Sequence, residues 1–198
     1  MAKGLVLALV GESGAGKSTT TRILSEKGFA PIALAKHLRE SAIAQYGTPT
    51  HQQVHALAQA TQEREGDDYY ARIALSDPAF DTASDVVIDG LRNLAEFEFT
   101  IGAVRRSDRS FFLMAIIASD DTRFSRVVNR ARAGDPMDRT LFDQDDARAR
   151  GQTQDRFQQN GLLIDLATHK LFNTSDLDDL HNNIDRAVDL ARKTAQRP

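Results

Sequence analysis

A glycine-rich stretch with one lysine and three hydroxyl side chains occupies residues 11–19, which read GESGAGKST. It fits the pattern G-x-x-x-x-G-K-[ST], whose fixed positions are Gly11, Gly16, Lys17 and Ser18. Glycine has no Cβ, so the backbone N–H groups of such a loop can turn inward and approach phosphate oxygens closely. The stretch therefore predicts a cradle for the phosphate tail of a nucleoside triphosphate.

The other residues of the stretch have expected roles in the same cradle. Lys17 is expected to reach the β- and γ-phosphates, Ser18 to bind Mg²⁺ through its hydroxyl, and Thr19 to support a phosphate contact. The helix that follows adds free N–H groups and the positive end of its dipole. The predicted nucleotide-binding residues are Gly11, Ser13, Gly14, Ala15, Gly16, Lys17, Ser18 and Thr19.

Two other interpretations of these glycines are weaker. A plain turn with a solvent-exposed lysine does not account for the apolar run before the stretch and the helical pattern after it. A dinucleotide site needs G-x-G-x-x-G, whereas lysine and serine follow the last glycine here. A triphosphate site is favoured, but it does not by itself separate an enzyme from a switch or a motor.

The elements that must position this loop alternate along the chain. Apolar runs predict buried strands, and apolar residues at 3–4 spacing predict helices between them. This alternation predicts an α/β fold of three layers with a mostly parallel central sheet. The expected strands are 4–10, 29–34, 85–90, 110–119 and 169–174, and the expected helices are 18–27, 35–47, 48–66, 67–76, 93–106, 120–133 and 176–194, with one or two polar helices in 140–161.

Composition limits the class of protein. With 41% hydrophobic and 27% charged residues, a chain of 198 residues can bury a globular core. The net charge of -3 provides no overall field that attracts nucleic acid. Cysteine is absent, which excludes disulfides and thiolate metal sites and fits a reducing compartment. The apolar run at 4–10 is too short to span a membrane, so we predict a soluble, cytoplasmic protein.

The strand expected at 85–90 ends in an acid, Asp89. This is the usual place for the carboxylate that holds Mg²⁺ in a triphosphate site, although a strand-end aspartate that caps a turn is the alternative. Gly90 follows where motor ATPases usually carry a second acid, which disfavours a hydrolytic motor. Arg92 is expected to grip an acceptor phosphate, and a surface pair with Glu96 is the alternative.

An arginine-rich segment follows the central strand. Arg123, Arg126 and Arg130 are spaced to share one helix face, and Arg132 lies just beyond. Phosphoryl transfer needs mobile guanidinium groups that cover the transferring charge and expel water. Arg130 and Arg132 stand where the helix runs into a loop, so they are the predicted lid cations. For the first two arginines, a solvated amphipathic helix explains the pattern equally well.

With these motifs in place, the chain resembles the adenylate-kinase-related, dephospho-CoA-kinase-like branch of the P-loop nucleotide kinases. VVIDGLRNLAEFEF is similar to that branch's D-G-[IL]-R-N-x-x-E-x-E pattern, and TRFSRVVNRARAGDP followed by FDQDDAR resembles its arginine-bearing lid. The resemblance covers about residues 4–190 and implies ATP and Mg²⁺ as cofactors. It also implies one kinase domain over 1–198, with a helical acceptor-binding region at about 36–80 and a lid at about 130–158.

The resemblance also implies acceptor-binding residues. QEREGDDYYARIAL is similar to the substrate-side helix of that branch, which implies a role for Arg64. ALAKHLRESA resembles a segment of the same branch and of phage-type deoxynucleoside monophosphate kinases, where Arg39 takes the basic position that faces the acceptor. Lys36 stands where those kinases carry an acid. It either binds a negative group of the substrate or lies in solvent.

Together these features predict an ATP-dependent kinase that acts on a small nucleotide or nucleotide-like acceptor. A phosphate acceptor is favoured, and phosphorylation of a hydroxyl, as in dephospho-CoA kinases, is the alternative. A GTPase-like switch would need N-K-x-D, whereas NTSD at 173–176 lacks the lysine. A kinase of a modified DNA base or a protein is a third class, and the net charge argues against nucleic acid. A homodimer is compatible with the sequence.

Three smaller interpretations complete the prediction. Asn173 either borders the adenine or simply ends the last strand. The acids at 143–146 are expected to form a solvated helix start. The five histidines show no metal-ligand spacing with partner acids, so a metal site made from them is not expected.

Overall fold

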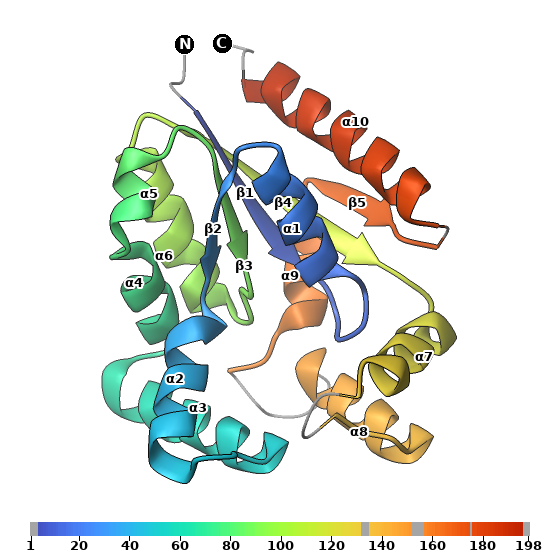
Figure 1. Ribbon diagram of the computed structural model, residues 1–198. Helices are drawn as coiled ribbons and strands as arrows, with labels where there is room; N and C mark the ends of the chain where they lie inside the picture. The colour runs from blue at the N-terminus through green and yellow to red at the C-terminus, as the bar shows by residue number, and fades with distance from the viewer. Residues whose placement is uncertain (1–3, 132–134, 152–156, 175, 196–198) are drawn as a thin grey trace.

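The computed structural model describes residues 4–131, 135–151, 157–174 and 176–195 (Figure 1). Its five described strands form one sheet, and every neighbouring pair is parallel. The sheet order is β2–β3–β1–β4–β5, so the first strand lies at the centre. The α/β prediction with a mostly parallel sheet is confirmed, and each strand falls within its predicted range: β1 Leu5–Val10, β2 Ala30–Ala33, β3 Val86–Asp89, β4 Ser110–Ile117 and β5 His169–Phe172.

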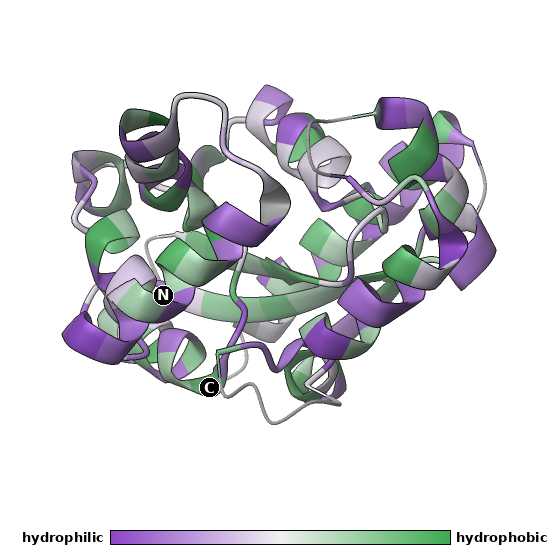
Figure 2. Cartoon of the chain, turned by 90° about the horizontal axis from the view of Figure 1, so that it is seen from below, coloured by the Kyte–Doolittle hydropathy of each residue, from purple (hydrophilic) through white to green (hydrophobic). Residues whose placement is uncertain are grey.

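The central strand β1 is buried along its whole length, as its continuous apolar sequence requires. Its side chains alternate between two hydrophobic cores, one on each face of the sheet. One core contains Val6 and Ala8, and the other contains Leu7 and Leu9. Figure 2 shows the hydrophobic strands enclosed between helices on both sides. The three predicted layers follow directly from this alternation.

Two groups of helices cover the two faces of the sheet (Figure 1). One face packs against α1 and α10, whose apolar residues belong to the same core as Leu7. The other face packs against α4, α5, α6 and α9. These elements are α1 Lys17–Glu26, α10 Leu177–Ala195, α4 Tyr69–Leu75, α5 Pro78–Thr82, α6 Leu94–Arg105 and α9 Asn160–Leu166.

The remaining helices lie beyond the carboxyl ends of the strands, as two separate groups (Figure 1). One group contains α2 Ala35–Tyr46 and α3 His51–Glu65, and the other contains α7 Asp120–Arg130 and α8 Arg139–Ala149. In open parallel sheets, ligands bind at the carboxyl ends of the strands. The two groups therefore flank the edge of the sheet where a site is expected.

Two short helices were not predicted: α9, of which only the first two residues fall within the range 140–161 that was expected to be helical, and α5. The sequence SDP at 76–78 was expected only to stop a helix, and it does separate α4 from α5. Asp77 also accepts a hydrogen bond from the N–H of Ala79 at 2.9 Å, and Pro78 takes the first helical position. The same residues therefore end one helix and begin the next. Among the described residues, no helix combines the length and apolar character needed to cross a membrane.

Candidate functional site

The glycine-rich loop lies between β1 and α1, where the motif requires it. Gly14 and Gly16 have φ values of +79° and +110°, in the region that favours glycine. A Cβ added to Gly14 would lie 2.5 Å from the carbonyl oxygen of Arg123, and one added to Gly16 would lie 2.2 Å from Asn173 Nδ2. The loop therefore has no room for side chains at these points, as expected for a cradle built from backbone N–H groups.

Asn173 holds the loop from behind. Its Nδ2 donates to the carbonyl oxygen of Ala15 at 2.8 Å, and its backbone N–H donates to Ile117 at 2.7 Å. Arg126 reaches the carbonyl oxygens of Ala15 and Asn173 at 3.4 and 3.2 Å. Asn173, directly after β5, thus supports the loop. The sequence analysis expected it either to border the adenine or simply to end the strand, and it included no such role.

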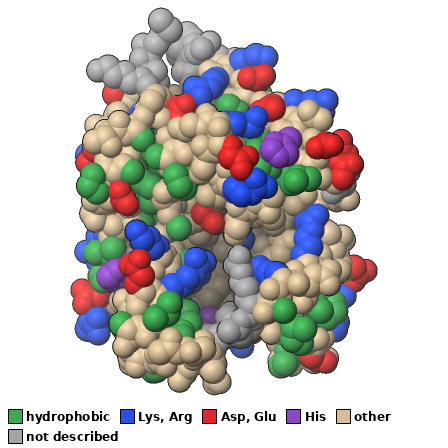
Figure 3. All heavy atoms as spheres, in the orientation of Figure 1, with side chains coloured by type: hydrophobic (Ala, Val, Ile, Leu, Met, Phe, Trp, Pro, Cys, Tyr) green, Lys and Arg blue, Asp and Glu red, His purple; other side chains and the backbone are tan. Residues whose placement is uncertain are grey.

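A cavity of about 1020 Å³ opens over this loop at the carboxyl edge of the sheet. Figure 3 shows a hollow in the lower half of the molecule, with Lys and Arg side chains on both sides of it. Ala15 is 1% exposed and does not line the cavity. The other predicted loop residues all do, namely Gly11, Ser13, Gly14, Gly16, Lys17, Ser18 and Thr19.

Lys17 lines this cavity and lies against the loop. Its Nζ donates to the carbonyl oxygens of Gly11 and Glu12 at 2.7 and 3.0 Å. Burial lowers the pKa of Lys17, the charge of Asp89 raises it, and the nearby charges of Arg92 and Arg130 lower it further. An anion bound beside Lys17 would favour its charged form, so this environment suits a phosphate.

Five arginines among the described residues reach the same cavity from α2, the loop after β3, α7 and α8. Arg130 forms a two-pronged ion pair with Asp135, at 2.6 and 2.8 Å, and donates to Ser13 Oγ at 3.1 Å. Arg148 was not singled out from the sequence, and it pairs with Asp145 at 3.0 Å. The signal that could have found it is the arginine at the end of the acidic segment FDQDDAR, within the predicted lid region. The complete set is Arg39, Arg92, Arg126, Arg130 and Arg148.

Not every predicted acceptor residue lies on the cavity. Lys36 and Arg64 are described and exposed, but neither lines it, and Arg64 pairs with Glu65 at 2.8 Å. The cavity-lining residues of α2 are Ala35, Arg39 and Ile43, at intervals of one helical turn. Since successive residues of a helix are rotated by about 100°, Lys36 faces another direction. Arg132, the second predicted lid cation, lies outside the described residues.

Arg92 is supported by Glu96, but through its backbone. The Glu96 carboxylate accepts the N–H of Arg92 at 2.8 Å, and Asn93 caps the same helix by accepting the N–H of Glu96 at 2.8 Å. Glu96 is only 1% exposed, so a surface ion pair does not describe this contact. Burial raises the pKa of Glu96 to about 7, although the charge of Arg92 and the hydrogen bonds act in the opposite direction.

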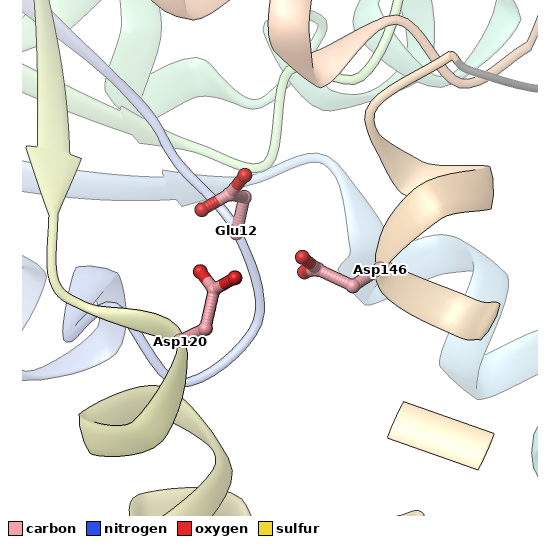
Figure 4. A group of neighbouring side chains, drawn as sticks. All are labelled: Glu12, Asp120 and Asp146. Atoms are coloured by element: carbon pink, nitrogen blue, oxygen red, sulfur yellow. The ribbon is translucent and has the colours of Figure 1, made fainter. Parts of the chain in front are cut away.

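Three carboxylates gather beside the loop, from Glu12, Asp120 and Asp146 (Figure 4). They are close enough to share a cation, but Arg123 and Arg150 already contact all three of them. The expectation that the acids at 143–146 are solvated is wrong for Asp146, which is 8% exposed. For Arg123, the solvated-helix alternative is also wrong, because its side chain is fully buried.

Comparison with solved structures supports the fold. TT1252 from Thermus thermophilus has a TM-score of 0.58 at 18% identity, covering 98% of this chain and 99% of that one. Shikimate kinase from Acinetobacter baumannii in complex with shikimate has a TM-score of 0.56 at 13% identity, covering 99% and 97%. A gluconokinase from Sinorhizobium meliloti 1021 has a TM-score of 0.51 at 17% identity, covering 98% and 96%. This chain therefore shares its architecture with a shikimate kinase and a gluconokinase.

Comparison with curated sequences identifies the family. No family model matches the chain. The UPF0200 protein of Hyperthermus butylicus is 31% identical over 192 residues, which cover 97% of this chain and 96% of that protein. UPF0200 protein MK0400 of Methanopyrus kandleri is 32% identical over 149 residues, covering 74% and 72%. The chain belongs to the UPF0200 family.

Proposed function

We propose that this protein is a small-molecule kinase that transfers the γ-phosphoryl group of ATP to a nucleotide or nucleotide-like acceptor. The observation that carries this proposal is the meeting of a glycine-rich phosphate cradle with five arginines on one cavity. The arginines come from both sides of the cavity and from the loop after β3, so they can surround a transferring phosphoryl group.

The donor side of the cavity is assigned to the loop. Its backbone N–H groups and Lys17 would hold the triphosphate, and Ser18 and Asp89 offer the oxygen ligands that Mg²⁺ prefers. When bound, Mg²⁺ would neutralise part of the phosphate charge. Arg130 would turn from Asp135 toward the transferring group, and Arg132 is assigned the same role. We assign the region at about 130–158 as the lid.

The acceptor side is assigned to the helical region at about 36–80 and to Arg92. Arg39 and Arg92 would bind the acceptor anion, and Ile43, Pro49 and Val54 provide an apolar wall beside them. An apolar wall suits a nucleobase better than a compact polyhydroxylated acid such as shikimate or gluconate. The volume of about 1020 Å³ leaves room for two substrates, since single-ligand pockets are roughly 300–1,000 Å³.

A phosphate acceptor is favoured over a hydroxyl because it needs no strong general base. Most cavity carboxylates in the described residues are engaged by arginines: Asp135 with Arg130, Asp145 with Arg148, and Asp146 with Arg123. Asp89 is assigned to Mg²⁺. A hydroxyl acceptor would require Asp89 to act as the base as well.

The test is a coupled ADP-release screen over nucleoside monophosphates, deoxynucleotides and dephospho-CoA, with shikimate and gluconate as comparison acceptors. At least one nucleotide should raise ADP release well above the acceptor-free rate. Lys17→Ala should abolish that turnover without changing the thermal unfolding midpoint, since Lys17 bonds only to the loop carbonyls of Gly11 and Glu12 among the described residues. A flat response to every acceptor, or full activity in the variant, would contradict the proposal.

A further inference from the structure

Arg123 has the most extensive set of polar contacts around the cradle. Its side chain is 0% exposed, although it sits on a helix that faces the nucleotide cavity. Its guanidinium binds Asp146 with two prongs at 2.6 and 2.8 Å, Asp120 at 2.8 Å and the carbonyl oxygen of Ser13 at 3.2 Å. Its Nε also lies 3.2 Å from the carboxylate of Glu12. Arginine is rarely buried this completely unless its charge is paired.

These partners join three separate elements. Glu12 and Ser13 belong to the phosphate loop, Asp120 begins α7, and Asp146 lies on α8, as Figure 4 shows for the three acids. The backbone of α7 also touches the loop directly, because an added Cβ on Gly14 would meet the Arg123 carbonyl oxygen at 2.5 Å. The shape of the loop is thus set in part by Arg123 through both its side chain and its backbone.

The electrostatics keep this guanidinium charged. Burial by itself lowers the pKa of Arg123, but the hydrogen bonds to Asp146 and Asp120 and the charge of Glu12 together raise it. Arg150 contacts the same three carboxylates from the end of α8. The network therefore fastens α8 to the loop, and α8 brings Phe142 and Arg148 to the cavity wall.

We propose that Arg123 is a positioning residue, which holds the phosphate cradle in its binding shape and couples it to α8 through Asp146. It does not touch the cavity itself in the described structure. The inference rests on the proposed function only in that the cradle binds a nucleoside triphosphate. It requires no knowledge of the acceptor.

The test compares Mg–ATP binding by calorimetry in Arg123→Lys and in a matched control, Arg139→Lys. Lysine keeps the charge but cannot bridge separate acceptors with a planar fork. Arg139 of α8 also links to α7, through Asp121 at 2.6 Å, and it pairs with Asp143 of its own helix at 2.9 Å, but these pairs are exposed. We expect the dissociation constant to rise at least tenfold for Arg123→Lys and less than twofold for Arg139→Lys.

Asp146→Asn keeps the side-chain volume and removes the charge that links α8 to Arg123. It should weaken Mg–ATP binding at least threefold while the protein stays folded. If Arg123→Lys does not fold, the affinity of Asp146→Asn for Mg–ATP tests the inference in its place. Unchanged binding in a folded variant of either residue would overturn the inference, as would an equal loss in the control. If the unaltered protein binds no Mg–ATP, the proposed function is contradicted. If it binds Mg–ATP and the variants bind it equally well, only the inference about Arg123 is contradicted.

Discussion

Replacing Gly16 with alanine tests whether the loop needs bare backbone. Gly16 has a φ of +110°, and its added Cβ would lie 2.2 Å from Asn173 Nδ2. A residue with a Cβ in this conformation costs about 1–3 kcal/mol. Asn173 would also have to give up its bond to the Ala15 carbonyl oxygen, and an unsatisfied buried group costs about 1–3 kcal/mol.

Together these effects amount to about 2–4 kcal/mol, because they are not fully additive. The strain falls on the loop that is assigned to the phosphates, so Gly16→Ala should weaken Mg–ATP binding by roughly 30-fold to 1,000-fold. Calorimetry measures this change. Gly28→Ala is the matched control, since Gly28 has a φ of +93° and its added Cβ would meet nothing within 4 Å. It should lower the thermal midpoint but leave the dissociation constant unchanged.

A double-mutant cycle separates the clash from the backbone strain. Asn173→Ala removes the atom that an alanine at position 16 would strike, at the expense of the bond to Ala15. The double variant should therefore lose less binding energy than the sum of the two single variants, by about 1 kcal/mol or more. Strict additivity would show that Asn173 and Gly16 do not contact each other as described. Normal nucleotide binding by Gly16→Ala would refute the assignment of the cradle.

Two further predictions concern Glu96 and Asp89. Burial raises the pKa of Glu96 from 4.5 to about 7, so the unfolded chain releases this proton at lower pH than the folded protein. The free energy of unfolding should then fall by about 3 kcal/mol between pH 4.5 and pH 7. Glu96→Gln has no carboxyl group to titrate at this position, so it should lack this fall in stability. Urea unfolding at pH 5 and pH 8 measures the difference. Identical pH dependence in both proteins would contradict the pKa. Asp89→Asn should reduce the apparent Mg²⁺ affinity of Mg–ATP binding by about 10-fold to 100-fold, as a magnesium titration would show, with metal-free ADP binding unchanged as the control.

Much of the fold and the centre of the site could be predicted from the sequence, because the signals are local. Uninterrupted apolar residues such as those of β1 leave few alternatives to a buried parallel strand. Parallel strands bring their carboxyl ends to one edge, so Asp89 and the glycine-rich loop had to lie near each other. Arg92 and Arg130 were expected there from their positions, shortly after the strand that ends in Asp89 and at the end of the arginine-rich helix, whereas the role of Arg39 came from the resemblance to nucleotide kinases. All three line the cavity in the structure.

The residues that sequence reasoning missed depend on contacts between distant parts of the chain. Helical spacing places Arg123 and Arg126 on one face, but it does not say which element covers that face. The burial of Arg123 depends on Asp146, 23 positions later, and the support of Ala15 depends on Asn173, 158 positions later. Lys36 and Arg39 illustrate the same limit within a single helix. A pattern marks both as acceptor residues, whereas only the packing of α2 decides which of them faces the cavity.

The loop is therefore shaped from outside as much as by its own glycines. Asn173 approaches it from the end of β5 and Arg123 approaches it from α7, and each comes so close that a Cβ on the loop would collide with it. Such contacts fix the loop before a ligand arrives, which reduces the ordering cost of binding. They also connect phosphate binding to the packing of α7, α8 and β5. Substitutions in those elements should thus change nucleotide affinity even where they never touch the nucleotide.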